Sequence, residues 1–293
     1  IRDRQYGVEA QILVAIWGLE SNFGNNIGSH SVIRSLATLA YDGRRQGFWR
    51  AQLLAALQIL QNGDVPSDRM IGSWAGAMGQ TQFMPTTYNQ HAVDFDGDGK
   101  RDLWNSSADA LASAAHYLQA SGWQRGQPWG FEVRLPSDFD YALADPDQRR
   151  SLTEWAELGV RPLAPTGAAA SARASLQLPA GHQGPAFLLL DNFRSILKYN
   201  NSTSYALAIG LLADNLLRST EIKGQWPRGE RQLGRSERVE LQELLAQAGF
   251  DPGPADGIIG ANTRKAIRAL QLQLNWPADG YPNTQLLQQL RTR

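Results

Sequence analysis

An apolar stretch that ends on a single carboxyl group constrains this chain more than any other feature. Apolar residues recur at roughly helical spacing over residues 12–19 and predict a buried helix. Glu20 ends this stretch, and the polar and glycine residues over 21–24 are typical of a helix end. An unpaired carboxylate is costly to bury, and an apolar setting raises its pKa, as a general acid near neutral pH requires. The segment therefore indicates a catalytic acid at Glu20, with a surface glutamate in a last helical turn as the alternative.

The composition describes a globular protein and excludes several classes of function. Of the 293 residues, 42% are hydrophobic and 19% are charged, as in folded domains rather than disordered chains. Basic and acidic residues both number 28, so no overall charge favours nucleic acid, and we expect no nucleic-acid partner. The absence of cysteine excludes disulfides and thiolate metal sites.

No transmembrane segment is expected, because no apolar run reaches the length of about eighteen residues that spans a bilayer. The chain begins at Ile1 without a charged-then-apolar leader. Any export signal or lipid anchor is therefore expected upstream of this residue.

The residue composition and the hydrophobic periodicity change along the chain, and these changes predict its domains. Helical periodicity dominates residues 1–222, apart from a β-prone insertion at about 124–190. Charged residues, Pro and Gly at 223–235 indicate a linker, and 236–293 read as a compact helical unit. We find no internal repeat. Helices are predicted over 51–60, 108–120, 191–197, 205–217, 238–248, 263–274 and 284–290, and strands over 131–135, 174–178 and 185–190.

An acidic loop over residues 94–102 follows the EF-hand pattern, in which alternate carboxylates converge on a hard cation. Gly99 permits the sharp turn at the sixth position, and Lys100 would contribute its backbone carbonyl. Asn105 stands where the bidentate glutamate is usual, and Asp109 in the next helix is the candidate replacement. We expect a structural Ca²⁺ site that does not take part in catalysis. The alternative is an Asx-rich turn that caps a helix.

Two further segments combine neutral hydrogen-bonding groups with small or aromatic residues. Residues 72–88 are rich in glycine but lack a lysine and the spacings of phosphate-binding loops. Their Ser73, Gln80 and Gln82 suit an uncharged substrate rich in hydroxyl and amide groups. Residues 199–205 mix aromatic and amide side chains just before a predicted helix. Each segment alone is more often a structural turn than a site.

Together these segments resemble the lytic transglycosylases of the membrane-bound lytic transglycosylase B family. The resemblance covers roughly residues 1–218 and keeps the order of the family's motifs. Those motifs are Gly-Leu-Glu-Ser-Asn-Phe-Gly at 18–24, Gly-Ser-Trp-Ala-Gly-Ala-Met-Gly-Gln at 72–80 with Gln-Phe-Met-Pro at 82–85, Asp-Phe-Asp-Gly-Asp-Gly at 94–99 followed by Leu103-Trp104, and Tyr-Asn…Ser…Tyr at 199–205.

The resemblance implies a mainly α (α+β) fold: a lysozyme-like helical domain with a small inserted β subdomain, acting on the glycan strands of peptidoglycan. It makes Glu20 the sole catalytic acid and base. The side chains that would surround the saccharide are Ser73, Gln82, Tyr117, Tyr199, Asn200 and Tyr205, together with Gln80 of the glycine-rich segment. The implied metal ligands are Asp94, Asp96, Asp98 and Lys100, with Asp109 as the helical carboxylate, although its spacing from Trp104 departs from the family's shorter one.

The chemistry implied by the family agrees with a single acid. An ordinary glycosidase needs two carboxyl groups, and we find one convincing catalytic carboxyl. The implied reaction cleaves the β-1,4 bond between N-acetylmuramic acid (MurNAc) and N-acetylglucosamine (GlcNAc) without water and leaves a 1,6-anhydro-MurNAc end. A hydrolytic muramidase and a non-catalytic wall-binding scaffold are the alternatives.

Residues 241–290 resemble the small three-helix peptidoglycan-binding module. Asp-Gly turns at 256–257 and 279–280 separate its helices, and Asp256 would cap or brace a turn whether or not it binds a ligand. The module would raise the effective concentration of glycan near Glu20. From the two resemblances together, we expect that the partner of the enzyme is the peptidoglycan glycan strand. We also expect a monomer that acts in the periplasm of a Gram-negative bacterium.

Overall fold

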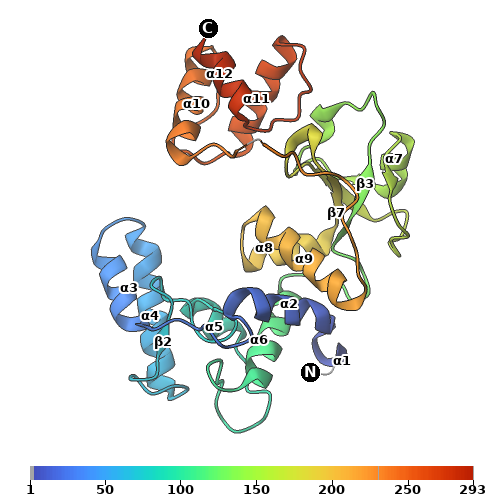
Figure 1. Cartoon of the computed structure of the whole chain (residues 1–293). Helices are drawn as coiled ribbons and strands as arrows, with labels where there is room; N and C mark the ends of the chain where they lie inside the picture. Colours follow the sequence, from blue (N-terminus) through green and yellow to red (C-terminus); the bar gives the residue numbers. More distant parts are fainter. Residues whose placement is uncertain (1–2, 230, 293) are drawn as a thin grey trace. The chain divides into compact units, whose positions relative to one another are not determined.

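The computed structural model describes residues 3–229 and 231–292. These residues form two compact units, which are described separately (Figure 1). The first unit comprises the chain up to Gln127 and resumes over Asp191–Thr220. The second comprises Pro128–Leu190 and the chain from Glu221 onward.

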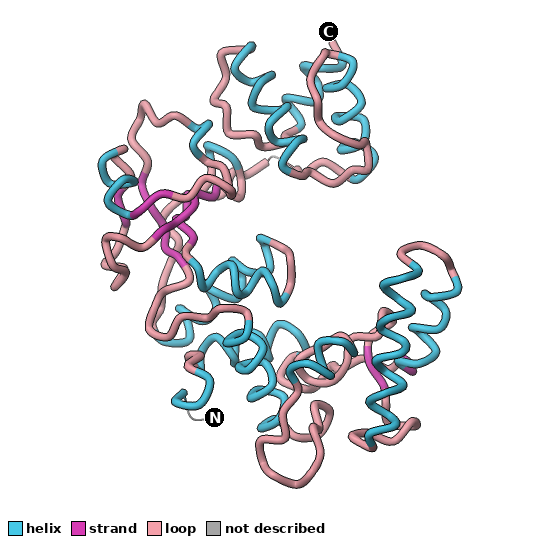
Figure 2. Tube along the Cα trace, turned by 180° about the vertical axis from the view of Figure 1, so that it is seen from behind, coloured by secondary structure: helices cyan, strands magenta, loops and turns pink. Residues whose placement is uncertain are grey.

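The first unit is helical and carries all the sequence motifs attributed to catalysis. Helix α2 packs against α9, and α3, α4 and α5 pack in sequence beside a short antiparallel pair of strands (Figure 2). Its elements are α1 (Asp3–Tyr6), α2 (Ala10–Ser21), β1 (His30–Ser31), α3 (Val32–Tyr41), α4 (Gln46–Asn62), β2 (Ile71–Gly72), α5 (Pro85–His91), α6 (Ser107–Ala120), α8 (Asp191–Tyr199) and α9 (Thr203–Leu217).

The second unit begins with an antiparallel sheet whose strands lie in the order β4-β6-β7-β3-β5. All four residues of the central strand β7 are buried, as expected for a strand covered on both faces. Trp155 fills the core beside the sheet and donates its indole N–H to the carbonyl of Ala174 at 2.9 Å. The elements are β3 (Gly130–Arg134), η1 (Tyr141–Leu143), β4 (Arg150–Ser151), α7 (Leu152–Glu157), β5 (Arg161–Pro162), β6 (Arg173–Gln177), η2 (Gly181–Gln183) and β7 (Ala186–Leu189).

Three helices at the C-terminal end of the second unit pack around their own apolar core (Figure 1). They are α10 (Arg235–Gln247), α11 (Ala261–Gln273) and α12 (Thr284–Arg291). The predicted fold class is confirmed: a mainly helical chain with a small five-stranded sheet in the second unit and a C-terminal three-helix module. Within the described ranges, no helix combines the length and apolar character needed to cross a membrane.

Candidate active site

Glu20 lies in the last turn of α2, where the preceding residues of the helix are largely buried. Tyr205, from the first turn of α9, donates its hydroxyl to Glu20 Oε1 at 2.6 Å. Burial raises the pKa of Glu20, and this effect exceeds that of the Tyr205 hydrogen bond, which lowers it. No second carboxylate among the described residues contributes to the shift. The arrangement therefore favours a protonated carboxyl at a higher pH than an exposed glutamate would allow.

The chain turns sharply after Glu20 through residues in the left-handed region. Asn22 and Phe23 have φ values of 49° and 58°, and Gly24 follows with 82°. A non-glycine residue with positive φ is strained, so its surroundings must hold it. The ring of Phe23 packs edge-on against Trp17 at 5.5 Å and lies over Gly18, where a Cβ would come within 3.0 Å of the ring. These contacts fix the helix end that positions Glu20.

Ser21 and Gln80 join this helix end to the glycine-rich segment. The Ser21 hydroxyl donates to the backbone carbonyl of Gln80 at 2.6 Å. The Gln80 side chain accepts the indole N–H of Trp17 at 2.9 Å and donates to the carbonyl of Trp104 at 3.2 Å. Gln80 is only 6% exposed, and both ends of its amide are engaged within the protein. Its side chain braces the site, which differs from the saccharide contact inferred from its residue type.

The glycine-rich segment approaches the loop after Glu20 so closely that only glycine fits. A Cβ on Gly28 would lie 2.1 Å from the carbonyl oxygen of Gly72, and Gly28 has φ +91°. Ser73 follows directly, and its hydroxyl oxygen accepts the N–H groups of Ala75 and Ala77. The close approach thus places the Ser73 turn against the loop that leaves Glu20.

We expect Gly28→Ala to destabilise the protein more than Gly43→Ala does. Both glycines have positive φ, but a Cβ on Gly43 would meet no atom within 4 Å. Gly43→Ala therefore reports backbone strain alone, about 1–2 kcal/mol, and Gly28→Ala adds overpacking of about 1–3 kcal/mol. Denaturant unfolding of both variants measures the difference. If both variants lose the same free energy of unfolding, the loop can move to accommodate a Cβ at Gly28, and the overpacking argument is wrong.

Gln82 and the aromatic candidates also lie in the first unit. Gln82 has φ 50° and donates its side-chain amide to the carbonyls of Ile27 and Gly79. The Tyr199 hydroxyl donates to the carbonyl of Thr81 at 2.6 Å, on the segment that carries Gln82. This bond therefore ties the aromatic segment to the glycine-rich one.

Tyr117 completes an aromatic cluster with Tyr199 and Phe83. The Tyr117 hydroxyl donates to the carbonyl of Lys198 at 2.7 Å, and the rings of Tyr117 and Tyr199 lie 5.4 Å apart. Burial raises the pKa of both tyrosines, so they remain neutral. Asn200 follows Tyr199 and is exposed. The structure thus brings the predicted saccharide-contact residues into the unit that holds Glu20.

The acidic loop gathers three of the predicted metal-ligating residues. Asp94, Asp96 and Asp109 each offer a carboxylate oxygen, and these oxygens lie within 4.8 Å of one another. This spacing fits a cation bound at 2.3–2.6 Å by several oxygens. Asp98 does not belong to this group, and its carboxylate accepts the backbone N–H of Lys100 at 2.9 Å.

Sequence reasoning missed the residues that support the site without touching a ligand. The sequence analysis gave no role to Trp17 or Phe83, but the Trp17 indole N–H donates to the Gln80 side chain and the Phe83 ring packs edge-on against Tyr117. Tyr205 was expected to contact the saccharide, and the structure shows that it binds Glu20. No local signal marks this pair, since 185 residues separate its members.

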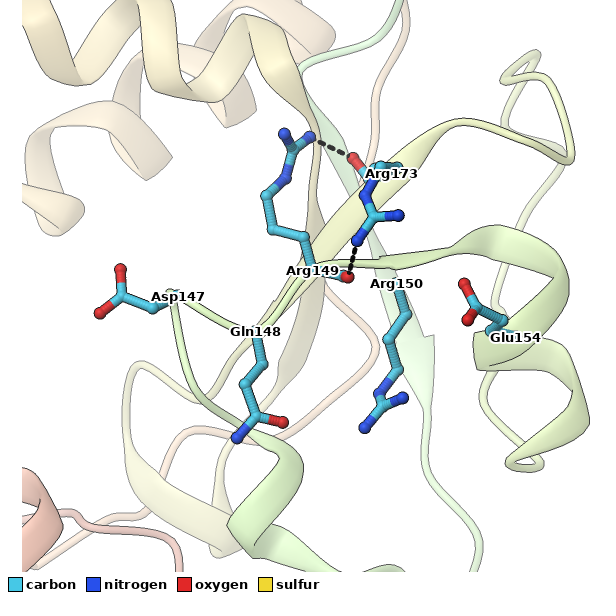
Figure 3. A pocket seen from close by; sticks show the side chains of 6 residues that line it. All are labelled: Asp147, Gln148, Arg149, Arg150, Glu154 and Arg173. Atoms are coloured by element: carbon cyan, nitrogen blue, oxygen red, sulfur yellow. Dashed lines mark hydrogen bonds between the residues drawn. The ribbon is translucent and has the colours of Figure 1, made fainter.

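A hollow lies at the edge of the sheet in the second unit. Its volume is about 590 Å³, and it is lined by Asp147, Gln148, Arg149, Arg150, Glu154 and Arg173. Figure 3 shows that the guanidinium groups of Arg149 and Arg173 each donate to the other's backbone carbonyl. Glu154 is engaged in the capping box of α7 with Ser151. These charges serve the local fold, so this hollow is not our candidate for catalysis.

Comparison with known proteins gives two family matches. The family model described as the transglycosylase SLT domain matches residues 2–214, and the model described as a peptidoglycan binding domain matches residues 234–290. Membrane-bound lytic murein transglycosylase B of Escherichia coli (strain K12) is 35% identical over 210 residues. These residues are 70% of this chain and 56% of the relative, so the chain matches little more than half the length of that relative.

Two solved structures resemble this chain over different shares of its length. SltB3 from Pseudomonas aeruginosa, in complex with NAG-anhNAM-pentapeptide, is 64% identical with a TM-score of 0.96 and covers 99% of this chain and 78% of its own. The Escherichia coli lytic transglycosylase Slt35, in complex with calcium, is 33% identical with a TM-score of 0.64. That match covers 74% of this chain and 70% of Slt35.

Proposed function

Because the chain belongs to the transglycosylase SLT domain family, we propose that it is a peptidoglycan lytic transglycosylase. It would cleave the MurNAc–GlcNAc β-1,4 bond without water and leave a 1,6-anhydro-MurNAc end. The observation that carries this proposal is Glu20, a half-buried carboxyl with a raised pKa whose partner is a tyrosine rather than a second acid. The complex of SltB3 with NAG-anhNAM-pentapeptide supports the same product class.

In this mechanism Glu20 first acts as a general acid. Burial raises the pKa of its carboxyl and so favours the protonated form, and because Tyr205 donates its hydroxyl to Oε1, we assign the transferable proton to Oε2. Glu20 transfers this proton to the glycosidic oxygen as the bond to C1 breaks. The resulting carboxylate is stabilised by the Tyr205 hydroxyl, because a hydrogen bond to a charged acceptor is stronger than one to a neutral group.

The substrate supplies the groups that the protein lacks. The acetamido carbonyl of MurNAc stabilises the positive charge that develops at C1. Glu20, now a carboxylate, removes the proton of the C6 hydroxyl, and the C6 oxygen closes on C1. One residue thus acts as acid and then as base, which accounts for the single carboxyl at the site.

The remaining candidates would bind the glycan around Glu20. We propose that Ser73, Gln82 and Asn200 supply hydrogen bonds to hydroxyl and acetamido groups. The hydroxyls of Tyr117 and Tyr199 already donate to backbone carbonyls, so these residues would contribute mainly their rings. Gln80 is buried and would support the site through its bonds to Trp17 and Trp104 rather than by contacting the glycan.

Product identity tests this proposal directly. Purified peptidoglycan is digested with the protein, and the muropeptides are analysed by mass spectrometry. Transglycosylation gives anhydro products, whereas hydrolysis gives products heavier by one water. Hydrolytic products would favour a muramidase, and no products would favour a wall-binding scaffold.

We expect Tyr205→Phe to shift the pH profile of cleavage as well as to slow the reaction. The Tyr205 hydroxyl lowers the pKa of Glu20, so its removal raises this pKa further. The general acid then stays protonated to higher pH, and the basic limb of kcat/KM moves to higher pH. Rate measurements across pH on soluble glycan strands test this. An unmoved basic limb would contradict the proposed role of Tyr205.

We also propose that the acidic loop binds a structural Ca²⁺. Asp94, Asp96 and Asp109 would hold the ion, with Asp98 and the carbonyl of Lys100 as further candidates from the loop. A bound cation there would neutralise the carboxylates and tie the loop to α6. The calcium complex of Slt35 supports this assignment.

The proposed domains are a catalytic domain at 1–222 with a β-rich insertion at about 124–190, a linker at 223–235 and a peptidoglycan-binding module at 236–293. The family matches at 2–214 and 234–290 support this division. We propose that the enzyme acts as a monomer in the periplasm of a Gram-negative bacterium, an expectation that rests on the proposed function and its cell-wall substrate.

A further inference from the structure

The C-terminal module contains two equivalent turns, although its sequence shows no obvious repeat. In the first, Gln242 accepts the N–H of Gly257 at 2.8 Å, and Asp256 Oδ1 accepts the N–H of Ile258 at 2.8 Å. In both turns the glycine after the aspartate has positive φ, +77° for Gly257 and +69° for Gly280. In this turn, the side chain of a helical glutamine thus holds the Asp-Gly backbone by accepting the N–H of the glycine.

The second turn repeats these bonds with the same geometry. Gln271 accepts the N–H of Gly280 at 2.9 Å, and Asp279 Oδ1 accepts the N–H of Tyr281 at 2.9 Å. Each glutamine also directs its amide toward Oδ1 of its aspartate, at 3.5 Å for Gln242 and 2.7 Å for Gln271. In both turns, Oδ1 is therefore engaged within the module and Oδ2 is left for another partner.

The second turn is occupied, and its occupant shows what such a turn binds. Asp279 Oδ2 accepts the backbone N–H of His182 at 2.8 Å, and the imidazole Nδ1 of His182 lies 2.8 Å from the same oxygen. Tyr281 contacts the neighbouring Gly181, where an added Cβ would come within 3.1 Å of the tyrosine. The bound segment therefore presents an amide N–H, a second polar donor and a small residue, and it leaves the Asp279 side chain only 3% exposed.

The first turn has the same groups without an occupant from this chain. Asp256 is exposed, and its Oδ2 has no hydrogen-bond partner among the described residues. Ile258, which stands in the place of Tyr281, is 68% exposed and offers apolar surface beside Asp256. A cavity of about 240 Å³ opens beside both residues, with walls that include Pro252, Pro254 and Asn262.

We propose that the turn at Asp256 and Ile258 is a ligand-binding site for an amide-bearing fragment of peptidoglycan. By analogy with His182, Asp256 Oδ2 would accept an amide N–H and a neighbouring N–H or O–H, while Ile258 packs against a small group beside them. Two parts of peptidoglycan carry this chemistry, the stem peptide and the acetamido sugars. This inference rests on the proposed function, which supplies peptidoglycan as the ligand.

Calorimetry on the full chain tests the site with two soluble probes, a free stem tetrapeptide and peptide-free glycan strands. The Glu20→Gln background prevents cleavage of the glycan. Asp256→Asn keeps the oxygen that accepts the N–H of Ile258 but replaces Oδ2 by a donor, so it should weaken binding of at least one probe roughly tenfold. The weakened probe identifies the source of the amide.

Asp251→Asn is the matched control, because Asp251 is an exposed acid on the same loop that does not line the cavity. Ile258→Ala tests the apolar contact at an exposed position and should weaken the same probe. Unchanged binding of both probes to Asp256→Asn and Ile258→Ala would overturn the inference. The proposed function is tested separately, by identifying the muropeptides that the protein with Glu20 intact releases. The binding site and the proposed function can therefore be refuted independently.

Discussion

Glu20→Gln is expected to lower kcat for glycan cleavage by at least about 10²–10⁴-fold. The amide cannot donate an acidic proton to the glycosidic oxygen or accept one from the C6 hydroxyl, so both proton transfers assigned to Glu20 fail. Glutamine keeps the size of the side chain and can still accept the Tyr205 hydroxyl. Release of muropeptides from purified sacculi measures the effect.

Stability measurements separate this effect from misfolding. Burial raises the pKa of Glu20 in the folded state, so the folded protein binds this proton more tightly than the unfolded chain does. The wild-type protein therefore loses stability relative to Glu20→Gln as pH rises through the interval between the unfolded and folded pKa values. Denaturant unfolding at several pH values checks this sign.

Glu157→Gln is a suitable control for the activity, because Glu157 is exposed in the other unit. It should cleave sacculi at the wild-type rate. Near-normal cleavage by Glu20→Gln, with the fold intact, would remove Glu20 from the mechanism.

Removal of Ca²⁺ is expected to destabilise the protein without abolishing the chemistry. Without a cation, the carboxylates of Asp94, Asp96 and Asp109 repel one another at close range. Calcium at a hundredfold excess over Kd would stabilise the fold by about 2.7 kcal/mol, which corresponds to a shift in Tm of roughly 5 °C or more. Thermal unfolding with Ca²⁺ and with a chelator measures the shift, and cleavage well below the transition should persist after chelation.

Two comparisons make this result specific to the acidic loop. Asp96→Asn should lose the response to Ca²⁺, whereas Asp68→Asn, at an exposed position outside the cluster, should keep it. Mg²⁺ should stabilise less, because it demands a tighter octahedral shell and gives up its water reluctantly. Identical melting with and without Ca²⁺ would refute the site.

The elements with strong local signals were predicted from the sequence. The apolar periodicity before Glu20 predicted α2, and the β-prone runs predicted β3, β6 and β7 within a few residues. Helices α3, α5 and α7 were not predicted, because they are short or lie among turn residues. Ser31 caps the N-terminus of α3, and Pro85 is the first residue of α5. Both are helix-start signals in the sequence, but they were not used to predict these helices.

The roles of individual polar residues were harder to predict than the segments that carry them. Gln80 was assigned to the substrate because its amide suits a sugar, yet it is buried and engaged by Trp17 and Trp104. Asp98 fits the loop pattern, but the group of converging carboxylates forms from Asp94, Asp96 and Asp109. Residue type and spacing predict which segment is polar, whereas burial decides which of its side chains remain available.

The sequence alone predicted the fold class and the family, which are confirmed, and it proposed Glu20 as the acid, because each of these depends on short motifs or local periodicity. Only the tertiary structure decided how Glu20 is held. The packing of α2 against α9 brings Tyr205 to within 2.6 Å of Glu20 Oε1 across 185 residues. Burial and that hydrogen bond shift the pKa of Glu20 in opposite directions, and no local pattern encodes their balance.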